Sequence, residues 1–380
     1  MQKFDAIRPF YDSEINEAIL NVVNHPMMKA MMNFTFPDSA DSVWKEQLRK
    51  THSIRDFQCN FIYNTIQKVL EKSSDGLTTS GFEKLEKNEA YLFISNHRDI
   101  LLDTTLLNVA LFEYGLVMTA SAIGDNLVKK DFLNTLAKLN RNFLVQRGLS
   151  PREMLQSSKT LSEYISHLLQ HESRSVWIAQ REGRTKDGND ATNPGVLKML
   201  GMGSDEADLM DYFKKIKIVP VSISYEYDPT DVLKIPQLMA EARNEVYIKE
   251  KNEDFMTLLS GVMGQKKRIH IHIGDVLEKE IDVIKNEFDN SNKQVQALAQ
   301  VIDDAILSNY KLWPTNFIAY DILNKTNMYS HLYTENEKSL FERRLEMRID
   351  ADNPVALQGL LDMYANPVVN KSKYKDVSKS

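Results

Sequence analysis

The first stretch that could do chemistry is ISNHRDILLD, residues 94–103. An apolar run ends there at Asn96 and His97, and the carboxylates of Asp99 and Asp103 follow. An imidazole removes a proton from a hydroxyl at neutral pH when a carboxylate holds its other ring nitrogen. His97 is therefore a candidate general base with Asp103 or Asp99 as its partner. The alternative is structural, with Asn96 and Asp99 capping the following helix and His97 lying in the turn.

A kinase catalytic loop and a metal centre are two other kinds of site that could use this stretch. The kinase loop requires an asparagine five residues after its aspartate, and Thr104 occupies that position. The eight histidines form no HExxH motif. His270 and His272 alternate along one expected strand and share a face, but no third ligand lies near them in the sequence. We predict neither a kinase nor a metal site.

A second candidate is REGRTKDGND, residues 181–190, in which cations surround a Glu-Gly pair. Guanidinium groups close to exposed backbone amides form a phosphate clamp, because their forked donors match phosphate oxygens. The stretch NFLVQRG adds another cation after a short apolar run. The alternative is a charged surface loop with no ligand. The residues concerned are Arg147, Arg181, Glu182, Gly183, Arg184 and Lys186.

Short β-rich runs separated by helical stretches must position these motifs. The runs are AYLFISN, GLVMTAS, SVWIAQ, IKIVPVSISY and RIHIHIG. Their alternation with helices predicts an α/β core with a parallel or mixed sheet. YLFISNH and VWIAQREG each lead a strand into polar residues at its carboxyl end, where open α/β sheets bind ligands. We therefore expect both motifs at the same edge of the sheet.

Helical periodicity flanks this core on both sides. SEINEAILNVVNHPMMKAMM and VQALAQVIDDAILSNY carry apolar residues at helical spacing, and Asp75-Gly76 signals a helix end and a turn. We predict a helical N-terminal region over residues 1–75, an α/β domain over 76–280 and a helical C-terminal region over 281–380.

The bulk composition excludes several classes of protein. With 42% hydrophobic and 26% charged residues, the 380-residue chain can form a globular core. A net charge of −6 argues against general nucleic-acid binding. The single Cys59 excludes a disulfide framework and fits a reducing compartment. The first residues lack a secretory-signal pattern, and no charge-free apolar run is long enough to cross a bilayer. We predict a cytoplasmic protein without nucleic-acid partners or a spanning segment.

Four blocks, taken in order, resemble the glycerolipid acyltransferase superfamily of the lysophosphatidic acid acyltransferase type. SNHRDILLD is similar to its Asn-His-acidic block, NFLVQRG to its second block, WIAQREGRTKDG to its Glu-Gly-Thr-Arg block and IVPVSISY to its final strand. The resemblance covers roughly residues 80 to 280. It implies an O-acyltransferase that moves a fatty acyl chain from acyl-CoA or acyl carrier protein to the hydroxyl of a lysophospholipid or glycerol phosphate. No resident cofactor is implied.

The resemblance also assigns roles to matching positions. His97 would be the general base, and the acceptor alkoxide would attack the thioester directly, with no covalent acyl-enzyme. The implied substrate-binding residues are Asn96, Arg147, Arg181, Glu182, Gly183, Arg184 and Lys186. Lipid substrates imply peripheral contact with the inner face of the membrane. The Met-rich stretch HPMMKAMMNFTF would either lie in the bilayer interface or dock on the core.

The chain departs from the family pattern at two positions. The family aspartate follows its histidine after four intervening residues, and Leu102 occupies that slot here. We expect an adjusted turn to bring Asp103 into place, with Asp99 as the alternative. Thr185 occupies the arginine slot of the third block, so Arg184 would bind the anion, assisted by Lys186 or Arg181. A non-catalytic lipid- or phosphate-binding protein on the same scaffold and an acyl thioesterase remain alternatives.

Overall fold

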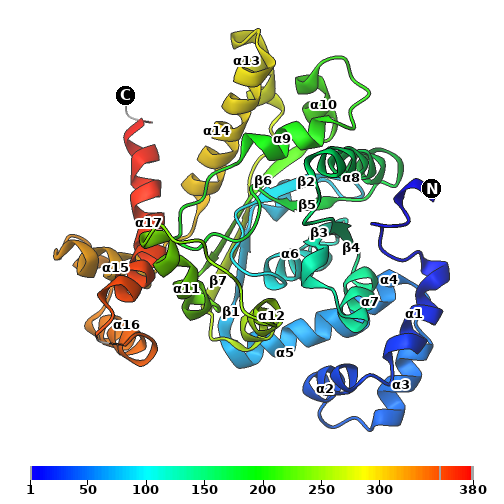
Figure 1. Cartoon of the computed structure of the whole chain (residues 1–380), viewed down its shortest axis with the longest axis horizontal. Coiled ribbons are helices and arrows are strands. Elements are labelled where there is room, and N and C mark those ends of the chain that lie inside the picture. The colour runs from blue at the N-terminus through cyan, green and yellow to red at the C-terminus, as the bar shows by residue number, and fades with distance from the viewer. Residues whose placement is uncertain (1, 351, 378–380) are drawn as a thin grey trace.

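A seven-stranded mixed sheet forms the centre of the computed structural model, which describes residues 2–350 and 352–377 (Figure 1). Its strands lie in the order β1-β7-β6-β2-β5-β3-β4. Only β6 and β7 are antiparallel among the neighbouring pairs of this sheet in the described residues. The strands are β1 Ser74–Ser80, β2 Leu92–Ser95, β3 Ala120–Gly124, β4 Asn142–Val145, β5 Val176–Ala179, β6 Ile218–Tyr225 and β7 Lys267–Ile273. The predicted α/β fold with a mixed sheet is confirmed.

Helices cover both faces of the sheet because its central strands are apolar on both sides. Every residue of β2 and β6 is buried, as expected for strands between two helical layers. One face packs against α8 Pro151–His171, α9 Pro194–Gly201, α10 Leu209–Lys215, α13 Glu278–Glu287 and α14 Ser291–Asn309. The other face packs against α5 Tyr63–Ser73 and α6 Leu102–Glu113.

Two strands were not predicted from the sequence. Strand β1, SDGLTTS, contains one large apolar residue, Leu77, and carries the Asp75-Gly76 turn signal. It is nevertheless paired in parallel with β7, and the hydroxyl of Thr78 lies 2.8 Å from Nδ1 of His270. Strand β4 is four residues long and lies at the opposite edge. Pairing with neighbours, rather than hydrophobic periodicity, forms both edges of this sheet.

The N-terminal helices form a separate apolar cluster that packs against α7 Asp131–Leu139 (Figure 1). Met28 and Met32 of the Met-rich stretch are fully buried in it, and Met27 and Met31 pack against it. Of the two alternatives for this stretch, the structure therefore shows docking within the protein. The helices are α1 Ile15–Val22, α2 Pro26–Thr35, α3 Asp41–Arg49, α4 Ile54–Phe57 and a π-helix Gln58–Ile62, which leads into α5.

The C-terminal helices surround α11 at the side of the sheet away from the N-terminal cluster (Figure 1). The remaining helices are α11 Asp231–Ala242, α12 Glu253–Met263, α15 Pro314–Asn324, α16 Glu335–Arg348 and α17 Pro354–Val377. Short 3-10 turns complete the fold at Gln2–Phe4, Asp12–Glu14, Phe82–Lys84, Asp125–Leu127 and Ser330–Leu332. Within residues 2–350 and 352–377, no helix is long and apolar enough to span a membrane. The predicted three-region division stays a prediction.

Candidate active site

The turn between β2 and α6 follows the carboxyl end of a central strand, because β2 pairs in parallel with both β5 and β6. We call this side of the sheet, where β2 and β5 end, its carboxyl edge. Buried Asn96 fixes the start of this turn. Its side-chain amide donates to the carbonyl of Ile223 in β6 and accepts from the N–H of the same residue, each at 2.8 Å. The structure thus gives Asn96 a positioning role, and its predicted contact with substrate stays a prediction.

His97 is held in the geometry of a general base. Its Nδ1 lies 2.8 Å from Oδ2 of Asp103. Because a carboxylate oxygen accepts, Nδ1 carries the proton and Nε2 of the neutral ring keeps its lone pair. Nε2 makes no hydrogen bond to any residue within 2–350 or 352–377, and 15% of the side chain is exposed. Trp177 forms a T-shaped pair with the ring at 5.4 Å between centroids.

Asp103 is a fully buried carboxylate with four hydrogen-bond donors. Besides His97, Oδ2 accepts from the backbone N–H groups of Arg98 at 2.6 Å and Asp99 at 3.0 Å. Oδ1 accepts from the hydroxyl of Tyr225 at 2.8 Å. The non-helical turn before α6 and the place of Asp103 in the first turn of that helix accommodate the extra residue relative to the family spacing.

Asp99, the alternative partner of His97, instead caps α6. Its Oδ1 accepts from the N–H groups of Leu101 at 3.0 Å and Leu102 at 2.9 Å. Burial and the neighbouring Asp103 raise the pKa of Asp99. Its Oδ2 is buried without a hydrogen bond in the described residues and faces Gly261 of α12, where an added Cβ would lie only 2.1 Å away. The structure therefore contains both a helix cap and a His-Asp pair, formed by different aspartates.

A buried ion pair joins this turn to the loop after β5. Nη2 of Arg98 donates to Oδ2 of Asp190 at 2.5 Å, and both side chains are about 95% buried or more. The N–H of Thr185 donates to the carbonyl of His97 at 3.1 Å. Nη1 of Arg98 is buried with no hydrogen bond among the residues that the structure describes. The two predicted motifs therefore contact each other directly.

Arg147, after β4, and Glu182, after β5, form an ion pair at the protein surface. Nη1 of Arg147 donates to Oε1 of Glu182 at 2.5 Å, and the Arg147 backbone N–H donates to Asp125. Both side chains are solvent-accessible. Gly183 has a φ of +73°, a conformation that favours glycine, and faces open space. The second and third sequence blocks thus meet, although Arg147 is already neutralised by a carboxylate.

Arg184 contacts the segment that follows β6, and Lys186 contacts the loop itself. Nη1 of Arg184 donates to Oγ1 of Thr230 at 3.0 Å, and Nζ of Lys186 donates to the carbonyl of Arg184 at 3.2 Å. Burial, followed by the charges of Arg184 and Lys234, lowers the pKa of Lys186 to about 7. Arg181 acts electrostatically on Asp190 and makes no hydrogen bond within the described part of the chain. Arg184 is also close enough to Asp99, two residues after His97, to act electrostatically on its carboxylate.

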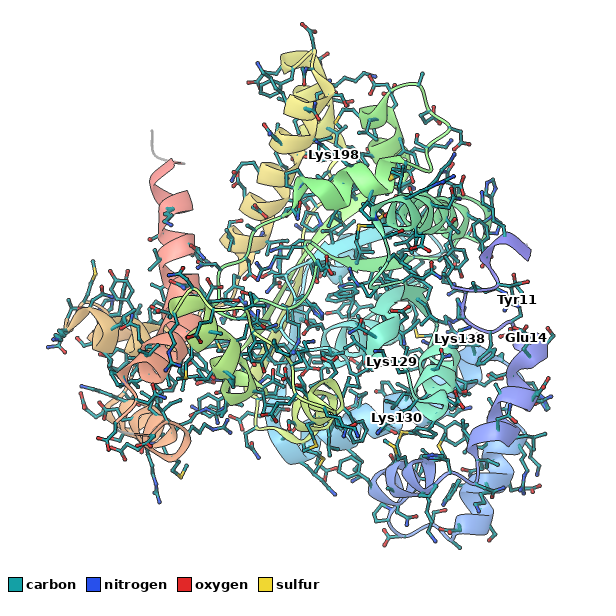
Figure 2. All side chains as sticks on the ribbon, viewed as in Figure 1. Tyr11, Glu14, Lys129, Lys130, Lys138 and Lys198 are labelled. Atoms are coloured by element: carbon teal, nitrogen blue, oxygen red, sulfur yellow. The ribbon has the colours of Figure 1, made fainter. Side chains whose placement is uncertain are left out.

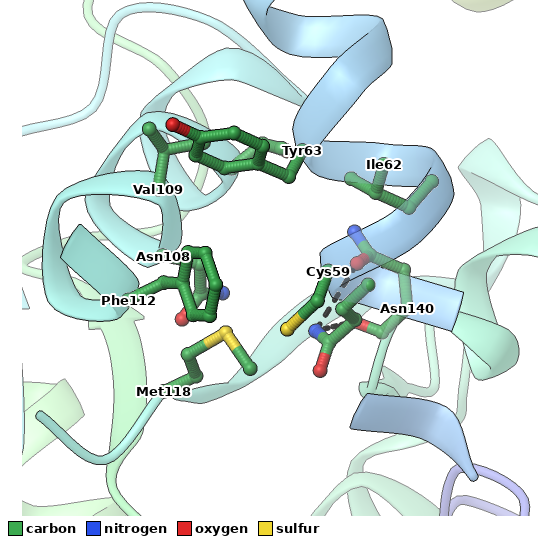
Figure 3. A pocket seen from close by; sticks show the side chains of 10 residues that line it. Cys59, Ile62, Tyr63, Asn108, Val109, Phe112, Met118 and Asn140 are labelled. Carbon is green, nitrogen blue, oxygen red and sulfur yellow. Dashed lines mark hydrogen bonds between the residues drawn. The ribbon is translucent and has the colours of Figure 1, made fainter. Parts of the chain in front are cut away.

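A small, partly open pocket of about 20 Å³ lies elsewhere, between the π-helix and α6 (Figure 3). Figure 3 shows Cys59 and Asn140 on one side and Phe112 and Met118 on the other. Thr105 lines it two residues after Asp103, but none of the predicted site residues does. The His97 site is thus separate from this cavity.

His270 and His272 bind hydroxyl groups of β1. The two ring nitrogens of His270 contact Thr78 at 2.8 Å and Ser80 at 3.0 Å, and Nδ1 of His272 contacts Ser80 at 2.8 Å. Burial lowers the pKa of His270 to about 4, so its ring is neutral at pH 7. Across residues 2–350 and 352–377, no three metal-ligating side chains gather.

Comparison with known proteins adds the family. Residues 76–224 match the family model described as Acyltransferase. This segment is therefore similar to an acyltransferase domain. It contains every predicted site residue and ends immediately before Tyr225. Among solved structures, the chain is similar to the 1-acyl-sn-glycerophosphate (LPA) acyltransferase PlsC from Thermotoga maritima, with 12% identity and a TM-score of 0.38. That match covers 78% of this chain and 94% of that one. No curated protein matches the chain.

Sequence reasoning missed several residues that position the candidate site. Tyr225 ends the strand run IVPVSISY and reaches Asp103, and its place at the carboxyl end of a strand was an available signal. Trp177 lies in β5 and packs on His97. The Arg98–Asp190 pair had no signal, because 92 residues separate its members.

Proposed function

We propose that the acyltransferase domain moves a fatty acyl chain from acyl-CoA or acyl carrier protein to the hydroxyl of a lysophospholipid or glycerol phosphate. The observation that carries this proposal is His97, whose Nδ1 is held by buried Asp103 while Nε2 has no partner in the described residues. An imidazole so oriented accepts a proton at one defined atom. The acyl donor is a substrate, and the proposal includes no resident cofactor.

In this proposal the reaction takes place in one chemical stage on the enzyme. Nε2 of His97 removes the acceptor hydroxyl proton while the oxygen attacks the carbonyl carbon of the thioester. The ester C–O bond forms, the C–S bond breaks, and the thiolate leaving group takes the proton back from the imidazolium. Asp103 stabilises the imidazolium through its 2.8 Å hydrogen bond. No residue of the chain becomes acylated.

The cations beside His97 give the proposal its acceptor class. Arg184 and Lys186 are only partly buried and lie on the loop that touches the His97 carbonyl through Thr185. A phosphate there would meet charge-assisted donors. Arg181 is a further candidate donor, and Gly183 is open to solvent. Arg147 and Glu182 remain candidates whose ion pair must open before the guanidinium binds phosphate.

We place peripheral membrane contact on α12 and the loop before it. Val246 and Ile248 in the loop are 89% and 82% exposed. Met256, Leu259 and Met263 are about half exposed at spacings of three and four, which forms one stripe on α12. The buried side of α12 lies against Asp99 through Gly261. Lipid bound to this stripe would therefore be next to the catalytic turn.

Lysines border the same surface. Lys249 is close enough to Lys186 to affect its pKa. Lys130, which precedes α7 together with Lys129 (Figure 2), lies 4.3 Å from the ring of Phe255 in α12. We expect Val246→Asp with Ile248→Asp to weaken sedimentation with phospholipid vesicles, whereas Val283→Asp, at an exposed valine of α13, should not. Equal sedimentation of all three proteins would contradict this placement.

The deciding experiment compares the wild type with His97→Ala. Labelled acyl-CoA and lysophosphatidic acid in vesicles are the substrates, and circular dichroism checks folding. We expect the variant to lose roughly 10²–10⁴-fold in rate. Equal activity would refute the proposed base. Release of free fatty acid without esterification would indicate a thioesterase. Lysophosphatidic acid binding without turnover of any thioester would indicate a binding protein.

A further inference from the structure

Helix α17 packs against the loop that carries Arg184 and Lys186, although the two are far apart in sequence. One close approach is at Gly188, which has a φ of +80°. A Cβ added there would lie 2.3 Å from the backbone carbonyl oxygen of Met363. Any other residue would therefore clash with the α17 backbone and adopt a strained conformation. The loop and the helix are in backbone-to-backbone contact.

Two asparagines one helical turn apart attach the loop to α17. Nδ2 of Asn366 donates to the carbonyl of Asp187 at 2.7 Å, and Nδ2 of Asn370 donates to Oδ1 of Asn189 at 3.0 Å. Asp187 in turn accepts from the hydroxyl of Thr185 at 3.2 Å and from the N–H of Asn189 at 3.0 Å. The hold of α17 thus extends to Thr185, whose N–H contacts the His97 carbonyl.

The same helix also reaches the residues on which Arg184 rests. The hydroxyl of Tyr364 accepts from the N–H of Asp228 at 3.1 Å and donates to Asp231 at 2.8 Å. Asp228 accepts from the N–H of Thr230 at 2.9 Å, and the Thr230 hydroxyl accepts from Arg184. Hydrogen bonds from α17 therefore reach both the loop after Lys186 and the residues that hold Arg184.

We propose that α17 is a positioning element of the acceptor site, which sets the distance between the loop cations and His97 and thereby the affinity for a phosphate-bearing acceptor. This inference rests on the proposed function. It gives the C-terminal helices a role, because α17 lies outside the segment that matches the acyltransferase family. In the described residues the His97–Asp103 pair makes no hydrogen bond to α17, so we expect the influence of α17 to fall on the acceptor.

The test uses full-length Asn366→Ala/Asn370→Ala. Asn324→Ala is the matched control, because it removes an amide-to-carbonyl hydrogen bond of 2.8 Å in α15, away from the loop. We expect the double variant to raise KM for lysophosphatidic acid about tenfold, with KM for acyl-CoA and kcat within twofold of wild type. Amide hydrogen exchange across residues 185–190 should accelerate in the double variant alone. Gly188→Ala should act in the same direction.

Two results would overturn the proposal. Unchanged exchange across residues 185–190 would show that α17 does not hold the loop. Faster exchange with an unchanged acceptor KM would show that loop position does not matter. Calorimetric binding of lysophosphatidic acid without any donor separates this inference from the proposed function. An enzyme that transfers no acyl chain but whose lysolipid affinity falls in the double variant would refute only the transfer.

Discussion

The turn after β2 and the loop after β5 lie at the same edge of the sheet but are held by different parts of the chain. The turn is fixed from within the core. Asn96 is hydrogen-bonded to the backbone of β6, and Asp103 is hydrogen-bonded to the backbone of the turn and to Tyr225. The loop is fixed largely from outside, by Thr230 and α17. The hydrogen bonds of Asn96, His97 and Asp103 thus involve none of the C-terminal helices in the described residues, whereas the loop that carries the proposed acceptor cations is bonded to α17.

The largest effect should come from a change in the turn after β2, at the partner of His97. Asp103→Asn keeps the shape of the side chain but removes the charge that stabilises the imidazolium. We expect kcat to fall by roughly 10²–10⁴-fold with the fold retained. Tyr225→Phe, which removes one of the four donors to Asp103, serves as a milder companion. Steady-state kinetics on both variants check this, and a Tyr225 effect as large as that of Asp103 would argue against it.

The Arg98–Asp190 ion pair links the turn to the loop, and removing it should mainly affect the stability of the protein. Arg98→Met leaves the carboxylate of Asp190 buried and unpaired, and we expect the free energy of unfolding to fall by about 3–5 kcal/mol. Urea denaturation measures this change. Arg98→Met/Asp190→Asn is the control, because it removes both charges and should recover part of the loss. A double variant no more stable than the single one would show that the unpaired carboxylate of Asp190 does not cause the loss of stability.

Arg184 and Arg147 provide the next comparison. We expect Arg184→Gln to raise KM for a phosphate-bearing acceptor by roughly 10- to 100-fold, the value of a charge-assisted hydrogen bond. Arg147→Gln should change it only several-fold, because that guanidinium is already paired with Glu182. Acceptor titrations at fixed donor concentration measure both. A larger effect on KM from Arg147→Gln than from Arg184→Gln would place the phosphate beside Arg147, which follows β4.

The smallest effect concerns the pH dependence of stability. Burial holds the pKa of Lys186 at about 7, compared with 10.5 for an exposed lysine. Between these values the unfolded chain binds more protons than the folded one, so stability rises with pH. Relative to Lys186→Met, the wild type should gain at most about 1.4 kcal/mol per pH unit between pH 7 and 9. Denaturation at three pH values checks this, and parallel profiles would contradict it.

Local patterns predicted the arrangement of the turn after β2 better than that of the loop after β5. The run LFIS ends at Asn96-His97 in the sequence and in the structure, and Asp103 lies within six residues of its partner. Strand β1 escaped prediction because its stability comes from pairing with β7 rather than from apolar side chains. The anchoring of Thr185 and Gly188 escaped it because their contacts lie on distant segments. A sequence pattern reports neighbours along the chain, and the loop is determined by neighbours in space.

The contact between Asp187 and Asn366 also has a consequence for synthesis. These residues are 179 positions apart, and a ribosome adds 5–20 residues per second. Roughly 10–35 s therefore pass between the making of the loop and the making of its anchor. The His97–Asp103 pair needs only six residues and the strand that ends at Tyr225. If the proposed roles hold, a nascent chain acquires its base first, and acceptor binding begins only when α17 emerges.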